Sequence, residues 1–322
     1  MGKIKLLSLF SGIGAFEKAL TNQKIEFDIV NYCEIDKYAA KCYAHIHNVS
    51  EKLNLGDITQ VNIDNLPKNI DLLTHGSPCQ DFSISGKNKG GDEDSHTRSS
   101  LMWYSVRIIS QILPKYVVWE NVPNVLSKRH IHNFKKYLSV LNALGYDNQY
   151  SIFNSKDFGL PQNRDRIFVV SIRNDVKNSF DINKVNPHLP KTILKDFLCD
   201  DVKEDRYICK RQMKPLTSNI KNDIIVIGQV STKSSQAGKV YSMDGIFPTV
   251  CACTHGYAIG YVYRNNQVQL LTPEETFLLM GFSKDDFEKC KNLNMSNTQL
   301  YKMSGNSICV PILEYIFKQL IK

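Results

Sequence analysis

The chain of 322 residues contains no long hydrophobic run, no internal repeat and no low-complexity linker. Its first apolar stretch, residues 4–10, is followed by two glycines and then by charged residues. We therefore expect a buried strand there, and neither a signal peptide nor a membrane span. The Ser or Thr that a myristoylation signal needs near the start is also missing. These absences argue against a membrane partner and predict a soluble, cytoplasmic protein.

The sequence also lacks a pattern typical of a metal site. None of the nine cysteines forms a CxxC pair, and the closest two, Cys251 and Cys253, have only His255 nearby. We therefore expect reduced thiols and no metal. Hydrophobic residues make up 42% of the chain, which excludes wholesale disorder. The net charge of +8 suits a polyanionic partner, although a lysine excess alone is weak evidence for nucleic acid.

Short apolar runs alternate with helical periodicity as far as about residue 175. The expected strands are 4–10, 27–34, a short piece before Gly56, 70–76, 116–121, 149–154 and 167–172, and the expected helices are 14–22, 36–48, 99–113 and 127–144. This alternation predicts an α/β fold with a doubly wound, mostly parallel sheet.

The pattern changes after about residue 180, where short β-type runs lie among Gly, Ser, Thr and Asn. Helical character returns at 272–282 and 309–321. We expect a catalytic and cofactor-binding domain over 1–178, completed by a C-terminal helix at 295–322. A smaller, loop-rich β domain with a hinge should occupy 179–294.

The first expected strand leads into the glycine-rich turn Phe10-Ser-Gly-Ile-Gly14, which opens a helix. Such a turn lets a ligand approach the backbone closely, but Glu17 stands where a dinucleotide fingerprint has its third glycine. Glu34, at the end of the second strand, can bind both hydroxyls of a ribose. Asp57, at the end of the expected third strand, can accept a hydrogen bond from an adenine amine. These residues favour an adenosine ligand without a pyrophosphate, such as S-adenosylmethionine; NAD, FAD and a purely structural turn remain open.

The strand at 70–76 leads into Ser77-Pro78-Cys79-Gln80. A cysteine just past the carboxyl end of a parallel strand lies where open α/β sheets place their chemistry. The preceding proline stiffens the approach and suits a side chain that must be aimed. The alternative is a buried structural cysteine, one of nine.

Two further features favour chemistry at Cys79. The strand at 116–121 delivers Glu120 directly after an apolar run, where burial can raise the pKa of a carboxyl group enough for it to act as an acid near neutral pH. Arg164 and Arg166, in QNRDR, could bind a base carbonyl, a phosphate or the Glu120 carboxylate. The alternative for the two arginines is a solvated strand entrance.

Seven segments together resemble a known family. In order they are FSGIGAFE, NYCEID, GDIT, GSPCQDFS, WENV, QNRDR and SGNS, and they are similar to the blocks of cytosine-5 DNA methyltransferases, in particular compact bacterial or phage modification enzymes. The resemblance covers the chain except for about 175–225. It implies a Rossmann-like S-adenosylmethionine methyltransferase fold and double-stranded DNA as substrate. It also implies methyl transfer to C5 of a flipped-out cytosine in a short specific site, with S-adenosylhomocysteine as product. The expected setting is restriction-modification, with a cognate endonuclease acting separately and the chain a monomer.

The resemblance also implies roles for individual residues. Cys79 would add to C6 of cytosine, and Glu120 would hold or protonate N3. Arg166 would contact the cytosine carbonyl, and Arg164 would help position the base and the thiolate and is the first cation to consider for lowering the pKa of the thiol. The cofactor positions are Phe10, Gly12, Gly14, Glu34, Ile35, Asp57, Ile58, Pro78, Leu101, Asn306 and Ser307. Many members have tryptophan where Ile35 stands, which predicts weaker packing against adenine.

The polar segment 81–100 resembles the family's mobile loop that closes over the flipped base, and Ser85 stands where a serine enters the DNA. Segments 231–239 and 252–257 resemble recognition loops and carry side chains able to read major-groove edges. Gln236 is a candidate to fill the hole left by the cytosine, unless it belongs to a solvent-facing hairpin loop. The candidate DNA contacts are Gln80, Ser85, Lys233, Ser235, Gln236, Lys239, Thr254 and His255. Basic residues at 127–136 and 203–214 could contact phosphates or lie on exposed surfaces.

Three other functions compete with this interpretation. A tRNA cytosine-5 methyltransferase would share the cysteine and the Glu-Asn-Val pattern, but the late Cys-Phe-Thr signature of such enzymes is absent here. A non-catalytic DNA-binding relative would have lost active-site residues, whereas Cys79, Glu120, Arg164 and Arg166 are all present. A NAD-dependent oxidoreductase fits only the first fifty residues.

Overall fold

The structure is a computed structural model that describes residues 2–78, 91–93, 97–187, 189–199, 202, 204–231, 236–252 and 259–321; of residues 98, 218 and 219 it describes the backbone only. The chain divides into two compact units. The first comprises residues 1–153, 165–186 and 313–322, and the second comprises 154–164 and 187–312. The observed units differ from the expected division in three ways. Segment 154–164 lies in the second unit, residues 179–186 lie in the first, and only residues from 313 onward return to the first.

The first unit is built on a six-stranded sheet in the order β2-β1-β3-β4-β7-β5. Its strands are β1 (Ile4–Leu9), β2 (Phe27–Cys33), β3 (Leu72–His75), β4 (Tyr116–Asn121), β5 (Tyr146–Asn154) and β7 (Asp165–Arg173). Strands β2, β1, β3 and β4 pair in parallel, and β7 pairs antiparallel with β4. The predicted α/β fold with a mostly parallel sheet is therefore confirmed.

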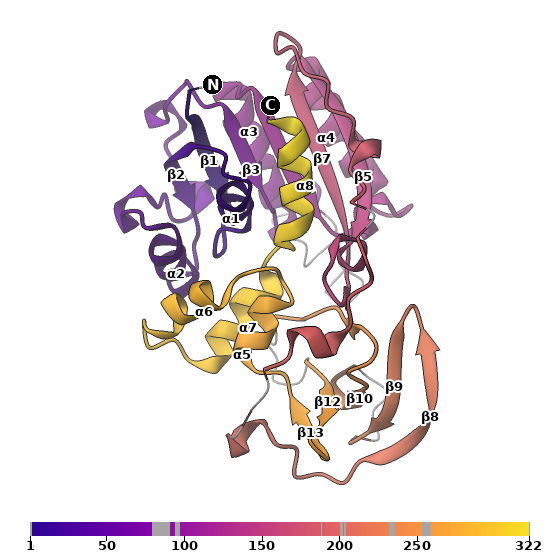
Figure 1. Ribbon diagram of the computed structural model, residues 1–322. Coiled ribbons are helices and arrows are strands. Elements are labelled where there is room, and N and C mark those ends of the chain that lie inside the picture. The colour runs from indigo at the N-terminus through magenta and orange to yellow at the C-terminus, as the bar shows by residue number, and fades with distance from the viewer. Residues whose placement is uncertain are drawn as a thin grey trace. The chain divides into compact units, whose positions relative to one another are not determined.

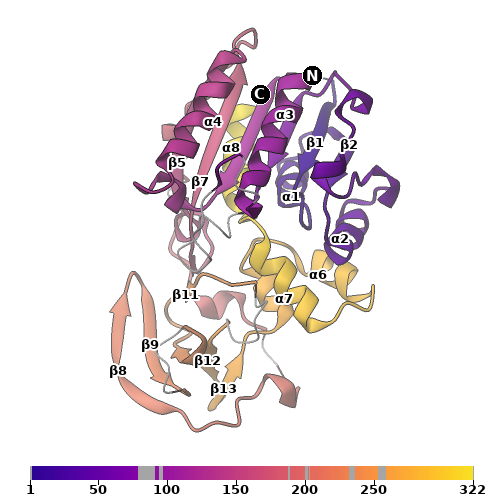
Figure 2. The same ribbon diagram turned by 180° about the vertical axis from the view of Figure 1, so that it is seen from behind.

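Helices cover both faces of this sheet. They are α1 (Ala15–Asn22), α2 (Lys37–His47), α3 (Met102–Ile112), α4 (Ile131–Ala143) and α8 (Val310–Leu320). Helices α1 and α8 lie on the face seen in Figure 1, and α3 and α4 lie on the face seen in Figure 2. Phe317 of α8 contacts Phe16 of α1, with ring centroids 6.4 Å apart. Because both faces are covered, every residue of β4 is buried, which is why its sequence is a continuous apolar run before Glu120.

The strand expected before Gly56 was wrong. Only an isolated bridge between Tyr32 and Asn54 forms there. Gly56 turns the chain with φ +71°, and Asp57 then caps a short 3-10 turn, Ile58–Gln60, by accepting a hydrogen bond from the Thr59 N–H. The segment thus lies beside β2 without forming a ladder.

The second unit contains a five-stranded sheet in the order β13-β12-β10-β9-β8 and a separate two-stranded pair, β6 with β11. The strands are β6 (Gln162–Asn163), β8 (Lys214–Lys221), β9 (Ile224–Gln229), β10 (Lys239–Tyr241), β11 (Phe247–Pro248), β12 (Tyr261–Arg264) and β13 (Gln267–Leu270). Three helices follow: α5 (Pro273–Leu278), α6 (Lys284–Lys291) and α7 (Asn297–Asn306). The sequence analysis did not predict β8, β13 or α6.

The single C-terminal helix expected at 295–322 was also wrong. Ser307 ends α7 in an extended conformation, with φ −75° and ψ 168°. Helix α8 then begins at Val310. Pro311 lies in its first turn, where a backbone N–H would have no intrahelical acceptor, so the missing N–H of proline costs no hydrogen bond. Among the residues that the structure describes, no helix is long and apolar enough to cross a bilayer.

A buried ion pair organises the start of α5. Arg264 and Glu275 form it with side chains only 4% and 0% exposed. The same carboxylate accepts hydrogen bonds from the Thr272 N–H at 2.7 Å and the Cys199 N–H at 2.9 Å. Glu275 therefore balances a buried guanidinium and satisfies two backbone donors at once.

Glu275→Ala should lower the free energy of unfolding by about 3–5 kcal/mol, because it leaves the buried Arg264 charge without its counter-ion. Glu274→Ala, which removes only a surface pair with Lys284, should cost about 1 kcal/mol or less. Urea unfolding of both variants measures the difference. Equal losses of unfolding free energy in the two variants would show that the buried Arg264–Glu275 pair stabilises the fold no more than the Glu274–Lys284 pair does.

His75, at the end of β3, is fully buried. Its Nε2 lies 3.0 Å from the Tyr137 hydroxyl, and its ring stacks on Trp119 with centroids 5.9 Å apart. Burial lowers the pKa of His75 to about 3, so the folded protein holds this imidazole neutral.

An unfolded histidine has a pKa near 6.5, so below that pH the unfolded state binds a proton that folded His75 does not accept. The contribution of His75 to stability is complete above pH 6.5 and is lost as the pH falls towards 3. Between pH 6.5 and 5 the free energy of unfolding should fall with a slope approaching about 1.4 kcal/mol per pH unit from this residue. His75→Gln should flatten the slope, whereas substitution of the exposed His45 should not. Identical slopes in all three proteins would contradict the assignment.

Candidate active site

The glycine-rich turn after β1 has left-handed backbone at Phe10 (φ +53°), Gly12 (φ +56°) and Gly14 (φ +82°). A Cβ on Gly14 would come within 2.0 Å of Nε2 of His47, so only glycine fits there. A Cβ on Gly12, by contrast, would meet nothing within 4 Å. The turn is thus tightly packed against His47 at Gly14, whereas the space beside Gly12 is open and leaves room for a ligand against the backbone.

Glu34 directly follows β2, and two backbone donors fix its carboxylate. Oε2 accepts from the Gly12 N–H at 2.9 Å, and Oε1 accepts from the Asp36 N–H at 2.8 Å. The Glu34 carboxylate therefore accepts from the Gly12 N–H, a donor that a dinucleotide-binding turn would offer to a pyrophosphate. Beside it, the side chain of Ile35 is 72% exposed and presents an apolar surface. An open turn, a fixed carboxylate and an exposed apolar side chain fit an adenosine ligand without a pyrophosphate.

The remaining cofactor candidates of the first unit lie around this turn or in the core. Asp57 Oδ1 accepts from both the N–H and the hydroxyl of Thr59, each at 2.9 Å. Ile58 is buried in the main core, and Leu101 packs against the same core. Asn306 and Ser307 end α7 in the second unit, where Asn306 is exposed and Ser307 is buried.

Cys79 lies outside the described residues, and so do Gln80 and Ser85. The two residues before Cys79 are described, and the first unit holds both of them firmly. Ser77 Oγ accepts from Trp119 Nε1 at 3.0 Å and from Asn121 Nδ2 at 3.2 Å, and Asn121 also donates to the Ser77 carbonyl at 3.2 Å. The Pro78 carbonyl accepts from the buried Ser99 hydroxyl at 3.1 Å. The peptide that leads to Cys79 is thus fixed at two successive residues.

Glu120, on β4, pairs with Arg166, on β7. Arg166 Nε lies 3.0 Å from Glu120 Oε1, and the two side chains are 15% and 10% exposed. The Glu120 carboxylate, one of the three partners considered for this arginine, is therefore in contact with it.

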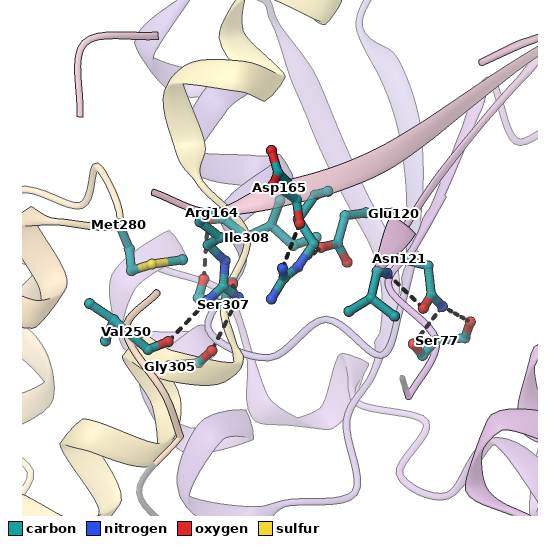
Figure 3. A network of polar contacts seen from close by, with 12 residues as sticks. Ser77, Glu120, Asn121, Arg164, Asp165, Val250, Met280, Gly305, Ser307 and Ile308 are labelled. Carbon is teal, nitrogen blue, oxygen red and sulfur yellow. Dashed lines mark hydrogen bonds and ion pairs between the residues drawn. The ribbon is translucent and has the colours of Figure 1, made fainter. Parts of the chain in front are cut away.

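Arg164 belongs to the second unit and is 3% exposed. Its guanidinium donates to the carbonyls of Val250 at 3.0 Å, Gly305 at 3.2 Å and Ser307 at 2.8 Å, as Figure 3 shows. The two arginines of QNRDR therefore do not act as a paired fork. Arg164 holds main chain within the second unit, and Arg166 holds a carboxylate within the first.

Gln162 and Asn163, at the beginning of QNRDR, hold the segment at 247–250 within the second unit. Strands β6 and β11 pair in parallel, the Gln162 side chain accepts from the Val250 N–H at 2.8 Å, and Thr249 donates to the Asn163 carbonyl at 2.8 Å. Gln236 in turn donates to the Thr249 carbonyl at 2.9 Å.

Two of the candidate DNA contacts in the second unit are therefore placed, Gln236 and the half-buried Lys239 of β10. The other four lie outside the described residues: Lys233, Ser235, Thr254 and His255.

Sequence reasoning missed Ser77, Ser99 and Trp119 as supports of the peptide before Cys79. Ser77 and Trp119 are adjacent to the candidate catalytic residues in GSPC and WEN, so proximity in sequence was an available signal. Nothing in the local sequence indicated Ser99, because its contact joins residues 21 positions apart.

The family model described as C-5 cytosine-specific DNA methylase matches residues 4–322. The type II methyltransferase M.HhaI of Haemophilus parahaemolyticus is 33% identical over 97% of this chain and 93% of its own length. The type II methyltransferase M2.ScrFI of Lactococcus lactis subsp. cremoris is 38% identical over 85% and 73%. The orphan methyltransferase M.SPRI of Bacillus phage SPR is 30% identical over 100% and 98%.

The solved structure of the Dnmt2 methyltransferase of S. pombe superposes with a TM-score of 0.76 at 20% identity, covering 98% of this chain and 99% of that one. This likeness shows the fold. The family match and the curated relatives go further: the chain belongs to the C-5 cytosine-specific DNA methylase family and is a DNA (cytosine-5)-methyltransferase.

Proposed function

We propose that Cys79 is the nucleophile of this methyltransferase and that Glu120 and Arg166 act on the cytosine ring. The Cys79 thiolate adds to C6, and the displaced electron pair moves towards N3, where Glu120 holds or supplies a proton. C5 then becomes an enamine-like carbon that attacks the sulfonium methyl. Loss of the C5 proton to a base or water allows the thiolate to leave, and the aromatic ring is restored. Because C6 is hidden in a stacked duplex, the target base must first be flipped out.

The observation that carries this proposal is the Glu120–Arg166 pair. Nε of Arg166 lies 3.0 Å from one oxygen of the Glu120 carboxylate and so restricts the orientation of that group. Arg166 also keeps a guanidinium beside the carboxylate, where it can contact the cytosine carbonyl. The peptide before Cys79 is held by the same strand, β4, through Trp119 and Asn121. One buried strand thus positions both the proposed acid and the approach to the nucleophile.

The family uses S-adenosylmethionine, which supplies the methyl group as a sulfonium. In this chain Glu34 would hold the ribose, the exposed Ile35 would lie against adenine and Asp57 would meet the adenine amine. Phe10 and Gly12 would line the methionine end, where the turn is open. Leu101 would complete the part of the pocket that the first unit supplies. The Arg164 contacts support a positioning role for this residue, exerted through the main chain at Val250, Gly305 and Ser307.

We further propose that the second unit recognises a short specific site in double-stranded DNA. The beginning of QNRDR holds the segment at 247–250, and Gln236 donates to the Thr249 carbonyl of that segment, so this part of the unit can support recognition side chains. The type II names of two relatives favour a restriction-modification setting, with a separate endonuclease that cuts the same site.

Purified protein should transfer methyl groups to duplex DNA, and bisulfite sequencing should map 5-methylcytosine to one short site. DNA with 5-fluorocytosine at that site should trap a covalent adduct, because fluorine cannot leave C5 as the proton does. Cys79→Ser should abolish the adduct, and Cys309→Ser, a buried cysteine elsewhere in the chain, should retain it. An adduct formed by Cys79→Ser would show that another residue is the nucleophile.

Glu120→Gln should lower kcat by about 100-fold or more, because the amide cannot donate the proton to N3 in the same way. Arg166→Lys should also lower kcat, since an ammonium cannot reproduce the planar guanidinium contact. Asp147→Asn, an exposed carboxylate change on β5, serves as the matched control and should leave kcat unchanged. Single-turnover methylation at saturating cofactor measures the effect. Full activity of Glu120→Gln would remove Glu120 from the mechanism.

A further inference from the structure

The segment at 53–57 lies beside β2 without being a strand, and one side chain replaces the missing ladder. Asn54 Nδ2 donates to the Glu34 carbonyl at 3.0 Å, and Asn54 Oδ1 accepts from the Glu34 N–H at 3.0 Å. The carboxamide therefore makes the two-bond pairing with Glu34 that a residue of a neighbouring strand would make. It extends the pairing of β2 by one residue beyond Cys33, where the strand ends.

The same side chain also fixes the turn that leads to Asp57. Asn54 Oδ1 accepts a second hydrogen bond, from the Gly56 N–H at 3.0 Å. The Gly56 carbonyl accepts from the Cys33 thiol at 3.0 Å. Burial, together with the nearby Glu34 and Asp57 carboxylates, raises the pKa of Cys33 to about 12, so this thiol stays protonated and keeps donating. Both backbone groups of Gly56 are thus tied to β2 or to Asn54.

We propose that Asn54 is a positioning residue for cofactor binding. Its carboxamide ties Glu34, the proposed ribose ligand, to the turn that carries Asp57, the proposed adenine ligand. The two carboxylates then meet the adenosine part of the ligand as one preorganised pair. This inference rests on the proposed function of Glu34 and Asp57, and it adds a residue that does not itself touch the ligand. Because Glu34 and Asp57 are ordered before the ligand binds, less conformational entropy is lost on binding.

Asn54→Ala removes all three hydrogen bonds. It should weaken binding of S-adenosylhomocysteine roughly tenfold, which titration calorimetry measures, and raise the KM for S-adenosylmethionine by a similar factor. The kcat at saturating cofactor and the Kd for DNA should stay unchanged, because neither depends on the adenosine end. The matched control is Asn62→Ala. Asn62 makes a similar side-chain bond to the Asp64 N–H at 3.1 Å on the same stretch of chain but has no bond to Glu34.

A double-mutant cycle separates positioning from a general loss of stability. If Asn54 acts through Glu34, then Asn54→Ala in a Glu34→Gln background should cost much less affinity than in the wild type. Asn54→Asp provides a second variant should the alanine protein fold poorly. It keeps both acceptor bonds but sets a carboxylate oxygen against the Glu34 carbonyl in place of the donor, so the affinity should fall at least as far as in Asn54→Ala.

The outcomes are distinguishable. Failure of the wild-type chain to bind S-adenosylhomocysteine would overturn the proposed cofactor site and this inference with it. Normal wild-type binding with equal affinity in Asn54→Ala would overturn the inference alone. Fully additive losses in the cycle would also overturn it, since they would mean that Asn54 does not act through Glu34.

Discussion

Polar groups at the carboxyl ends of β3 and β4 must find hydrogen-bond partners inside an apolar core, and the candidate active site is built on how they do so. Both strands are buried along their whole length, so an unpaired group there would carry a desolvation penalty of about 1–3 kcal/mol. Ser77 takes donors from Trp119 and Asn121, and the Pro78 carbonyl takes one from Ser99. The pairing that satisfies the core also immobilises the peptide before Cys79.

QNRDR shows how one short motif can serve two compact units. Side chains two residues apart in an extended chain share a face, so a common partner for Arg164 and Arg166 was a reasonable expectation. The chain instead passes from the second unit to the first between Arg164 and Asp165. Arg164 therefore satisfies three carbonyls around Val250, Gly305 and Ser307, while Arg166 pairs with Glu120. A change at Arg164 would act first on the main chain of the second unit, and a change at Arg166 would act first on the Glu120 carboxylate.

The sequence predicted the large sheet well because period and burial agree there. Strands such as 116–121 and 167–172 are long apolar runs, and the helix at 131–143 has a clear 3.6-residue period. The prediction failed where a side chain makes the hydrogen bonds that the backbone of a neighbouring strand would otherwise make. Asp57 has the right neighbours for a strand end, yet Asn54 satisfies β2 with its carboxamide and makes a ladder unnecessary. It also failed at Ser307, where α7 and α8 are separate helices, although Gly305 and Pro311 lie on either side of the break. Contacts between distant positions, such as Ser99 with Pro78, have no local signal at all.

The isoleucine at position 35 changes how the adenosine end must obtain its affinity. Where many family members are expected to stack a tryptophan on adenine, this chain offers a smaller aliphatic surface without a π-system, and an aromatic pair is worth about 0.5–1.5 kcal/mol beyond its buried area. In the proposed cofactor site the polar ligands then supply a larger share of the binding free energy. Polar contacts depend on geometry more steeply than apolar ones, so errors in the placement of the proposed ligands Glu34 and Asp57 would be more damaging here. The Glu34 carboxylate is fixed by the Gly12 and Asp36 N–H groups, and Asn54 and the Cys33 thiol fix Gly56, the residue before Asp57.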